Sequence, residues 1–251
     1  LWKLKLLSLL GLKMHINKYK KIIKLIEKNN LSSFELITNY GLFSGNTNLY
    51  KTLKIYDLVK SIENIKGDII EFGTFRGNTG ILIAKILNIL KIKKKIYLFD
   101  SFKGLQNFQK IEGGVKKKFK NKYKGNKLIL KEIIKFFDLK NVKIIENDAV
   151  QITNNFFKKY KFSLIILDMD LYEPTIKTLN ITHNYLSKGG KYVFDEGNSN
   201  LWLGEKKALN EFLKKNKTQY RKKIISQYRK KIISKFPYQP DVELKKIKKT
   251  P

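Results

Sequence analysis

The chain has 251 residues, of which 53 are Lys or Arg and 21 are Asp or Glu, so its formal net charge is +32. Its content of 42% hydrophobic and 12% aromatic residues is that of a globular protein and argues against global disorder. It contains no cysteine, which excludes disulfide frameworks and thiolate metal sites and is compatible with a reducing, cytoplasmic location.

The positive charge has two interpretations. It would suit a polyanionic partner such as RNA or an acidic membrane. The only arginines, however, are Arg76, Arg221 and Arg229, whereas phosphate-binding proteins generally use arginine as well as lysine. Lysine, isoleucine and asparagine also share AT-rich codons. We therefore favour a compositional origin for the charge and do not expect a nucleic-acid partner.

The N-terminal part of the chain is expected to be helical. Apolar residues recur at helical spacing in residues 16–28 and 48–62. Residues 1–13 are apolar but interrupted by Lys3 and Lys5, and no stretch reaches the roughly 20 apolar residues that a membrane span needs. We expect a helical extension over residues 1–65, a second unit over residues 66–251, and no integral membrane segment.

From residue 67 onward, short apolar runs alternate with amphipathic segments. Strands are expected at 67–73, 95–100, 141–148, 162–168 and 189–195, and helices at 78–90, 128–139, 151–160, 173–186 and 204–215. Such alternation is typical of βαβ units. It predicts a doubly wound α/β fold with a mostly parallel sheet.

Two segments interrupt this alternation. Residues 103–125 are rich in lysine and lack periodicity, so they form either a lid over a site or a solvated loop. Residues 219–234 are an exact tandem repeat, QYRKKIISQYRKKIIS, which is too short for a repeat architecture. We interpret the repeat as the duplication of one edge strand and assign it no function.

Every expected strand ends in or beside an acidic residue. In chain order these residues are Glu71, Asp100, Asp148, then Asp168 with Asp170, and finally Asp195 with Glu196. In an open α/β sheet, ligands bind beyond the carboxyl ends of the strands. Buried carboxylates are costly unless they are paired or bind a metal. The sequence therefore predicts a ligand site at this edge of the sheet.

The residues at that edge indicate an adenosine-type ligand and a hard cation. The glycines of EFGTFRGNTG, residues 71–80, allow a ligand close to the backbone, but their spacing is not that of a dinucleotide fingerprint. An acid at the second strand end suits ribose hydroxyls. Asp168, Asp195 and Glu196 offer the hard oxygen ligands that Mg²⁺ prefers. The histidines, His15 and His183, lie in helical segments and are interpreted as structural or surface residues.

The order and spacing of five strings, from about Tyr40 to Phe212, resemble the macrocin O-methyltransferase (TylF-type) family of class I S-adenosylmethionine-dependent enzymes. The strings are GDIIEFGTFRGNTG, FDSFKGL, LDMDLYEPTIKTL, GGKYVFDEGN and EKKALNEF. The resemblance implies a seven-stranded Rossmann-like sheet, S-adenosylmethionine as methyl donor, assistance by Mg²⁺, and methylation of a sugar hydroxyl on a small molecule. A homo-oligomer is compatible with it.

The resemblance also implies the roles of individual residues. Those expected to contact the donor are Glu71, Gly73, Thr74, Phe75, Arg76, Gly77, Asp100, Ser101, Asp148 and Asp168. Asp168, Asp195 and Glu196 would hold the metal, and Asp168 or Asp170 would accept the proton of the acceptor hydroxyl. The alternatives are a ribose or rRNA methyltransferase, a nicotinamide-dependent oxidoreductase, and a non-catalytic protein on the same fold.

Overall fold

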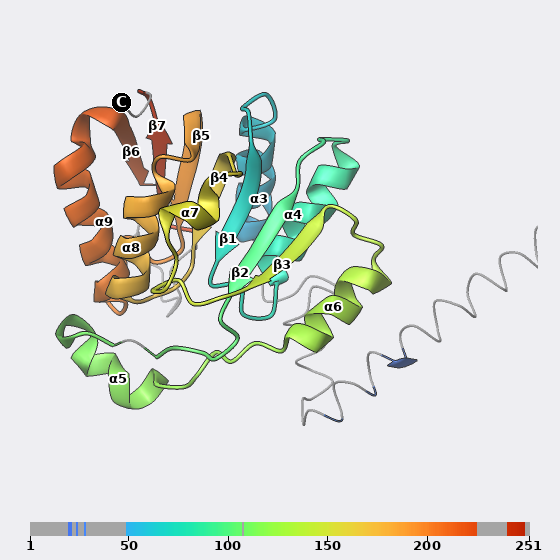
Figure 1. Ribbon diagram of the computed structural model, residues 1–251, viewed down its shortest axis with the longest axis horizontal. Helices are drawn as coiled ribbons and strands as arrows, with labels where there is room; N and C mark the ends of the chain where they lie inside the picture. The colour runs from blue at the N-terminus through green and yellow to red at the C-terminus, as the bar shows by residue number, and fades with distance from the viewer. Residues whose placement is uncertain are drawn as a thin grey trace, which may run out of the picture.

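The computed structural model describes residues 49–106, 108–224 and 240–248, together with Lys20, Lys21, Lys24 and Lys28, which are helical (Figure 1). The remainder of the helix expected at 16–28, the apolar residues 1–13 and the second copy of the repeated octamer lie outside these residues. Within the described part of the chain, no helix is long and apolar enough to cross a membrane.

One mixed sheet forms the centre of the described chain. Its strands are β1 (Asp68–Phe72), β2 (Ile96–Asp100), β3 (Val142–Glu146), β4 (Phe162–Leu167), β5 (Leu186–Phe194), β6 (Tyr220–Ile224) and β7 (Val242–Lys246). They lie in the order β3-β2-β1-β4-β5-β7-β6, and β7 runs antiparallel to both of its neighbours. The seven-stranded, mostly parallel sheet is therefore confirmed, and the first copy of the repeat forms its edge strand.

Helices cover both faces of the sheet (Figure 1). α3 (Leu49–Ser61), α4 (Asn78–Ile89) and α6 (Lys127–Phe136) pack on one face, and α7 (Asn154–Phe157), α8 (Tyr172–Thr182) and α9 (Leu203–Asn216) on the other. Alternate residues of β1 enter opposite cores, Ile69 with α3 and α4, and Ile70 with α8 and α9. This doubly wound arrangement is the predicted fold class.

Three boundaries differ from the sequence prediction. α8 ends at Thr182, and β5 begins at Leu186 rather than at residue 189. The pairing of β4 with β5 shifts register between Phe162 and Leu164, which lets the longer β5 pass through Gly189 at φ +83°. α7 is only one turn long. α3 packs into the same core as the sheet, and the division of the chain at residue 65 stays a prediction.

The lysine-rich segment after β2 is partly helical. It contains a 3₁₀ turn (Lys110–Glu112) and α5 (Gly113–Phe119), and Figure 1 shows α5 outside the two helical layers. Glu112 is buried and fastens the segment, because its carboxylate accepts the backbone N–H groups of Tyr172 and Gln109, both at 2.6 Å. The aperiodic sequence did not predict these turns. The segment is anchored at Glu112 and Val115, which are buried, whereas most of its other described residues are exposed.

Candidate active site

A cavity of about 1220 Å³ lies at the carboxyl ends of β1 to β5. The strand order reverses between β1 and β4, which is where ligands bind in open α/β sheets. The predicted residues that line the cavity are Glu71, Gly73, Thr74, Phe75, Arg76, Asp100, Ser101, Asp148, Asp168, Asp170, Asp195 and Glu196. The acids predicted from the strand ends are therefore brought together in one place.

The glycine turn after β1 brings the ends of β1 and β4 into contact. Gly73 has φ +83°, and a Cβ at this position would overlap the carbonyl oxygen of Asp168. Gly77 also has φ +83° and precedes the first residue of α4, but a Cβ there would meet the side chain of Leu130. Gly77 is not among the cavity-lining residues. It shapes the turn, and its predicted contact with the donor stays a prediction.

Asp100 connects the ends of β1 and β2. Its Oδ2 accepts the N–H of Phe75 and its Oδ1 accepts the N–H of Phe102, both at 2.6 Å. Burial raises the pKa of this carboxyl, and the two backbone hydrogen bonds oppose that rise. Each oxygen keeps a lone pair, so the carboxylate can still accept from a ribose hydroxyl. Asp148, whose Oδ1 caps the N–H of Val150 at 2.9 Å, lies at the neighbouring strand end.

Glu71 lies deep in the cavity wall. It is only 2% exposed, and its Oε2 accepts a hydrogen bond from Thr74 Oγ1 at 3.1 Å. Burial is the main cause that raises the pKa of Glu71 to about 8, while the Thr74 hydrogen bond and the Lys51 ammonium lower it. Such a carboxyl holds its proton near neutral pH and would regain its charge when a cationic group of a ligand lies beside it.

Asp168 and Asp170 form the acidic floor with Asp195 and Glu196. Burial raises the pKa of Asp168 well above its usual value, and the negative charge of Asp195 adds to this effect. The pKa of Asp170 is also raised well above its usual value, first by burial and then by Glu196 and Asp195. This mutual repulsion between carboxylates favours the binding of a cation.

Asp170 is held in an unusual backbone conformation by Glu205, a residue that the sequence did not single out. Asp170 has φ +62°, a backbone conformation that residues other than glycine seldom adopt. Glu205, on the first turn of α9, is fully buried and accepts the N–H of Asp170 at 3.3 Å and the N–H of Glu196 at 3.0 Å. One carboxylate thus joins the loops after β4 and β5.

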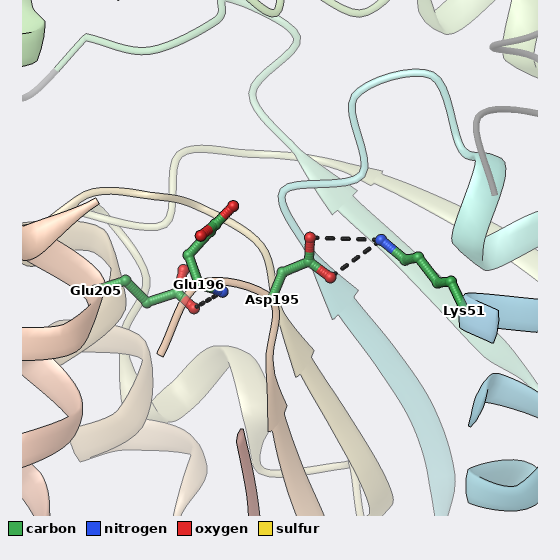
Figure 2. A network of polar contacts seen from close by, with 4 residues as sticks. All are labelled: Lys51, Asp195, Glu196 and Glu205. Atoms are coloured by element: carbon green, nitrogen blue, oxygen red, sulfur yellow. Dashed lines mark hydrogen bonds and ion pairs between the residues drawn. The ribbon is translucent and has the colours of Figure 1, made fainter. Parts of the chain in front are cut away.

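A lysine from the N-terminal helix enters the acidic cluster. Figure 2 shows Lys51 of α3 approaching Asp195 from the side opposite Glu196. Its ammonium lies 3.0 Å from Oδ1 and 3.4 Å from Oδ2 of Asp195. The pKa of Lys51 is raised because the attraction of Asp195, Asp168 and Glu71 outweighs the effect of burial. Sequence reasoning missed this residue.

The chemistry of the cluster fits a hard cation. Asp168, Asp195 and Glu196 provide oxygen ligands, and the repulsion among the neighbouring carboxylates would be relieved by a divalent ion. Across the described ranges, however, no three Asp, Glu, His or Cys side chains are grouped so that they could hold a metal ion. The predicted Mg²⁺ site therefore stays a prediction.

The segment after β2 supplies two rings, Phe119 and Tyr123, to an aromatic wall. Phe119 lies 4.9 Å from Trp202 and stacks on Tyr123 at 6.0 Å between ring centroids, and Tyr123 meets the edge of Phe75 at 5.7 Å. All four rings line the cavity. The segment is thus one wall of the site, and only its length and position hinted at this role.

The sheet order and the cavity at its switch point are those of a Rossmann-like fold that binds its ligand beyond the strand ends. A family model of the macrocin-O-methyltransferases (TylF) matches residues 44–227. The chain belongs to this family, and it is an S-adenosylmethionine-dependent O-methyltransferase. A search of curated proteins gave no match.

Solved structures of methyltransferases share the fold. The calicheamicin methyltransferase CalS11 is 20% identical with a TM-score of 0.67, over 92% of this chain and 91% of that chain. The O-methyltransferase NovP is 19% identical with a TM-score of 0.64, over 85% and 88%. An O-methyltransferase from Bacillus cereus in complex with SAH is 13% identical with a TM-score of 0.53, over 92% and 91%.

Proposed function

We propose that this enzyme transfers the methyl group of S-adenosylmethionine to a hydroxyl of a sugar or a glycosylated small molecule, with help from Mg²⁺. The observation that carries the proposal is that the strand-end acids and the aromatic wall line the same cavity. Its volume of about 1220 Å³ is larger than most small-molecule sites, so it has room for a donor and an acceptor together.

The donor would lie along the carboxyl ends of β1 to β4. The turn from Gly73 to Arg76 would follow its methionine part, Asp100 with Ser101 would bind the ribose, and Asp148 would lie near the adenine. The positive sulfonium would be stabilised by the negative floor of the cavity.

The acceptor would lie between the donor and the aromatic wall. The rings of Tyr123 and Trp202 offer apolar surface for the face of a sugar ring, and nearby polar groups can bind its hydroxyls. CalS11 is described as a TDP-rhamnose 3′-O-methyltransferase in calicheamicin biosynthesis. That description supports a sugar acceptor here and does not name it.

In the reaction, the acceptor oxygen attacks the methyl carbon, the bond from this carbon to sulfur breaks, and a methyl ether and S-adenosylhomocysteine form. Alignment of the two reactants is the main contribution of the protein. Asp170 would accept the hydroxyl proton, because its raised pKa makes it a stronger base than an ordinary aspartate and Glu205 fixes its backbone. Asp168, the other candidate base, would then be free to hold the metal.

Asp168, Asp195 and Glu196 are the residues that would hold Mg²⁺. When bound, the ion would orient the acceptor hydroxyl and lower its pKa. The residues around it would keep the donor and the acceptor in line and exclude water through the segment over residues 103–125.

The test is methyl transfer from radiolabelled S-adenosylmethionine to a panel of nucleotide-activated sugars and glycosides, with Mg²⁺ present. Asp170→Asn should lower kcat by about 100-fold or more while S-adenosylhomocysteine binds as before, because a general base contributes about that much. Wild-type activity should rise with pH as the base loses its proton, and this rise should be absent in the variant. The exposed Asp138→Asn is the matched control.

Wild-type turnover in Asp170→Asn would refute the assigned base. Methylation of RNA but of no sugar would replace the proposed acceptor. In that case binding to RNA should weaken steeply with salt.

A further inference from the structure

Lys51 engages the whole carboxylate of Asp195. The two residues are 144 positions apart in the sequence, and the Lys51 ammonium contacts both oxygens of Asp195, at 3.0 and 3.4 Å. The side chains are only 15% and 6% exposed. A buried pair of this kind is screened little by salt and is costly to break when no other charge replaces the partner.

The ammonium also interacts with one further acid of the floor and with the acid of the cavity wall. Its charge interacts with Asp168 and Glu71 in addition to Asp195. Together with the ion pair, these charge interactions place a protein cation close to two of the predicted metal ligands, Asp168 and Asp195. One of the predicted metal ligands, Asp195, is thus already paired with a cation of the protein.

We infer that Lys51 is an internal counter-ion that competes with the divalent cation for Asp195, so that the metal binds as Lys51 releases this carboxylate. The inference rests on the proposed metal site. Without a metal, Lys51 limits repulsion in the cluster. When a metal binds, α3 loses its ion pair to the end of β5, so the N-terminal helix is coupled to the loading of the site.

A different role for Lys51 predicts the opposite sign. If Lys51 kept its contact while Asp195 bound the metal, it would orient the ligand from outside, as partners of metal ligands commonly do. Removal of Lys51 would then weaken metal binding. The direction of the change in affinity therefore distinguishes competition from orientation.

The experiment measures Mn²⁺ binding to the full chain by electron paramagnetic resonance, without donor or acceptor. Lys51→Met removes the charge and keeps the length of the side chain. Its Mn²⁺ affinity should be higher than that of wild type by about tenfold or more, since a nearby competing charge is lost. Lys51→Arg should remain within about threefold of wild type because it keeps the charge.

Lys60→Met is the matched control for net charge, because Lys60 is an exposed residue on the same helix. Its Mn²⁺ affinity should not change. Asp195→Asn introduced into Lys51→Met should abolish the gain, which would assign the gain to this carboxylate. Circular dichroism establishes that each variant is folded, and Lys51→Gln replaces Lys51→Met if the latter does not fold.

An unchanged or weaker Mn²⁺ affinity in Lys51→Met would overturn the inference and leave the metal site in place. If neither wild type nor Lys51→Met binds Mn²⁺ while sugars are still methylated, the metal part of the proposed function is wrong, and the inference is wrong with it.

Discussion

Glu205→Gln tests whether one buried carboxylate positions the catalytic loops. Glu205 is fully buried, its Oε1 accepts the N–H of Glu196 at 3.0 Å, and its Oε2 accepts the N–H of Asp170 at 3.3 Å (Figure 2 shows the first contact). Glutamine keeps the size of the side chain but replaces one oxygen with an NH₂ group. The backbone N–H that had contacted the replaced oxygen then faces the NH₂ group, which is a donor and cannot accept its hydrogen bond.

The expected size of the effect follows from that lost acceptor. A buried N–H without a partner costs about 1–3 kcal/mol, so the free energy of unfolding should fall by about 2 kcal/mol. The loop carrying Asp170 should also shift, and a displacement of about 1 Å near reacting groups can lower turnover by about 100-fold. We expect kcat to fall by about 10- to 100-fold, with donor affinity changed by less than about threefold.

The assay combines urea unfolding, steady-state kinetics and calorimetric titration with S-adenosylhomocysteine. Glu211→Gln, the same substitution six residues further along α9 on a partly exposed residue, is the matched control. Glutamine keeps an oxygen that can accept the hydrogen bond from the Tyr172 hydroxyl, so stability should change by less than about 1 kcal/mol. A Glu205→Gln enzyme with wild-type kcat would refute the positioning role. Equal losses of donor binding and turnover would instead indicate general damage to the cavity.

Two further predictions concern the frame of the site. Gly73→Ala should destabilise the protein by about 3 kcal/mol or more in a thermal unfolding assay, because alanine at φ +83° is strained and its Cβ would overlap the carbonyl oxygen of Asp168. Gly113→Ala is the control. It has open space around it and should be tolerated in the same assay. Asp241→Asn should remove part of the pH dependence of stability. Burial raises the pKa of Asp241 from 3.8 to about 6, so its contribution is full below pH 3.8 and is lost as pH rises through 6. A wild-type slope in the variant over this window would contradict the assignment.

The acidic floor could be predicted from the sequence because its geometry is a property of parallel sheets. The carboxyl ends of parallel strands meet at one edge, so an acid at the end of each apolar run must lie near the others. β4 and β5 were recognisable as apolar runs, and Asp168 and Asp195 followed from their ends. These assignments required only the order of strands and helices along the chain, and no knowledge of how their side chains pack.

Lys51 and Glu205 could not be predicted in this way, because each reaches the site through helix packing. α3 precedes the sheet in sequence, and no local pattern specifies where along the sheet it docks. Gly204, the residue before Glu205, has no side chain. The start of α9 can therefore lie close to the N–H of Tyr172 and to Glu112 of the segment after β2. Both positions depend on contacts between segments far apart in the chain.

β7 was missed for a different reason. A buried strand is expected to alternate apolar and polar residues, but in VELKK the third inward position is Lys246. This lysine is only 1% exposed and donates hydrogen bonds to the carbonyl oxygens of His183 and Leu186, at 2.6 and 2.9 Å. Its carbon chain fills the core while its ammonium caps the end of α8, so a charged residue occupies a core position.

The protein has a positive net charge, whereas its site is lined by acids. The two are compatible because the exposed charges act only over short distances. A protein of net charge +32 would repel both a sulfonium and a divalent cation if its charges acted over long range. At physiological ionic strength, however, exposed charges are screened beyond about 8 Å, whereas buried groups are screened much less. The carboxylates of Asp168, Asp170 and Asp195 therefore determine the local potential, and the buried Lys51 opposes them more effectively than the exposed lysines can. This is why a single lysine can be expected to control cation binding in a chain that carries 53 basic residues.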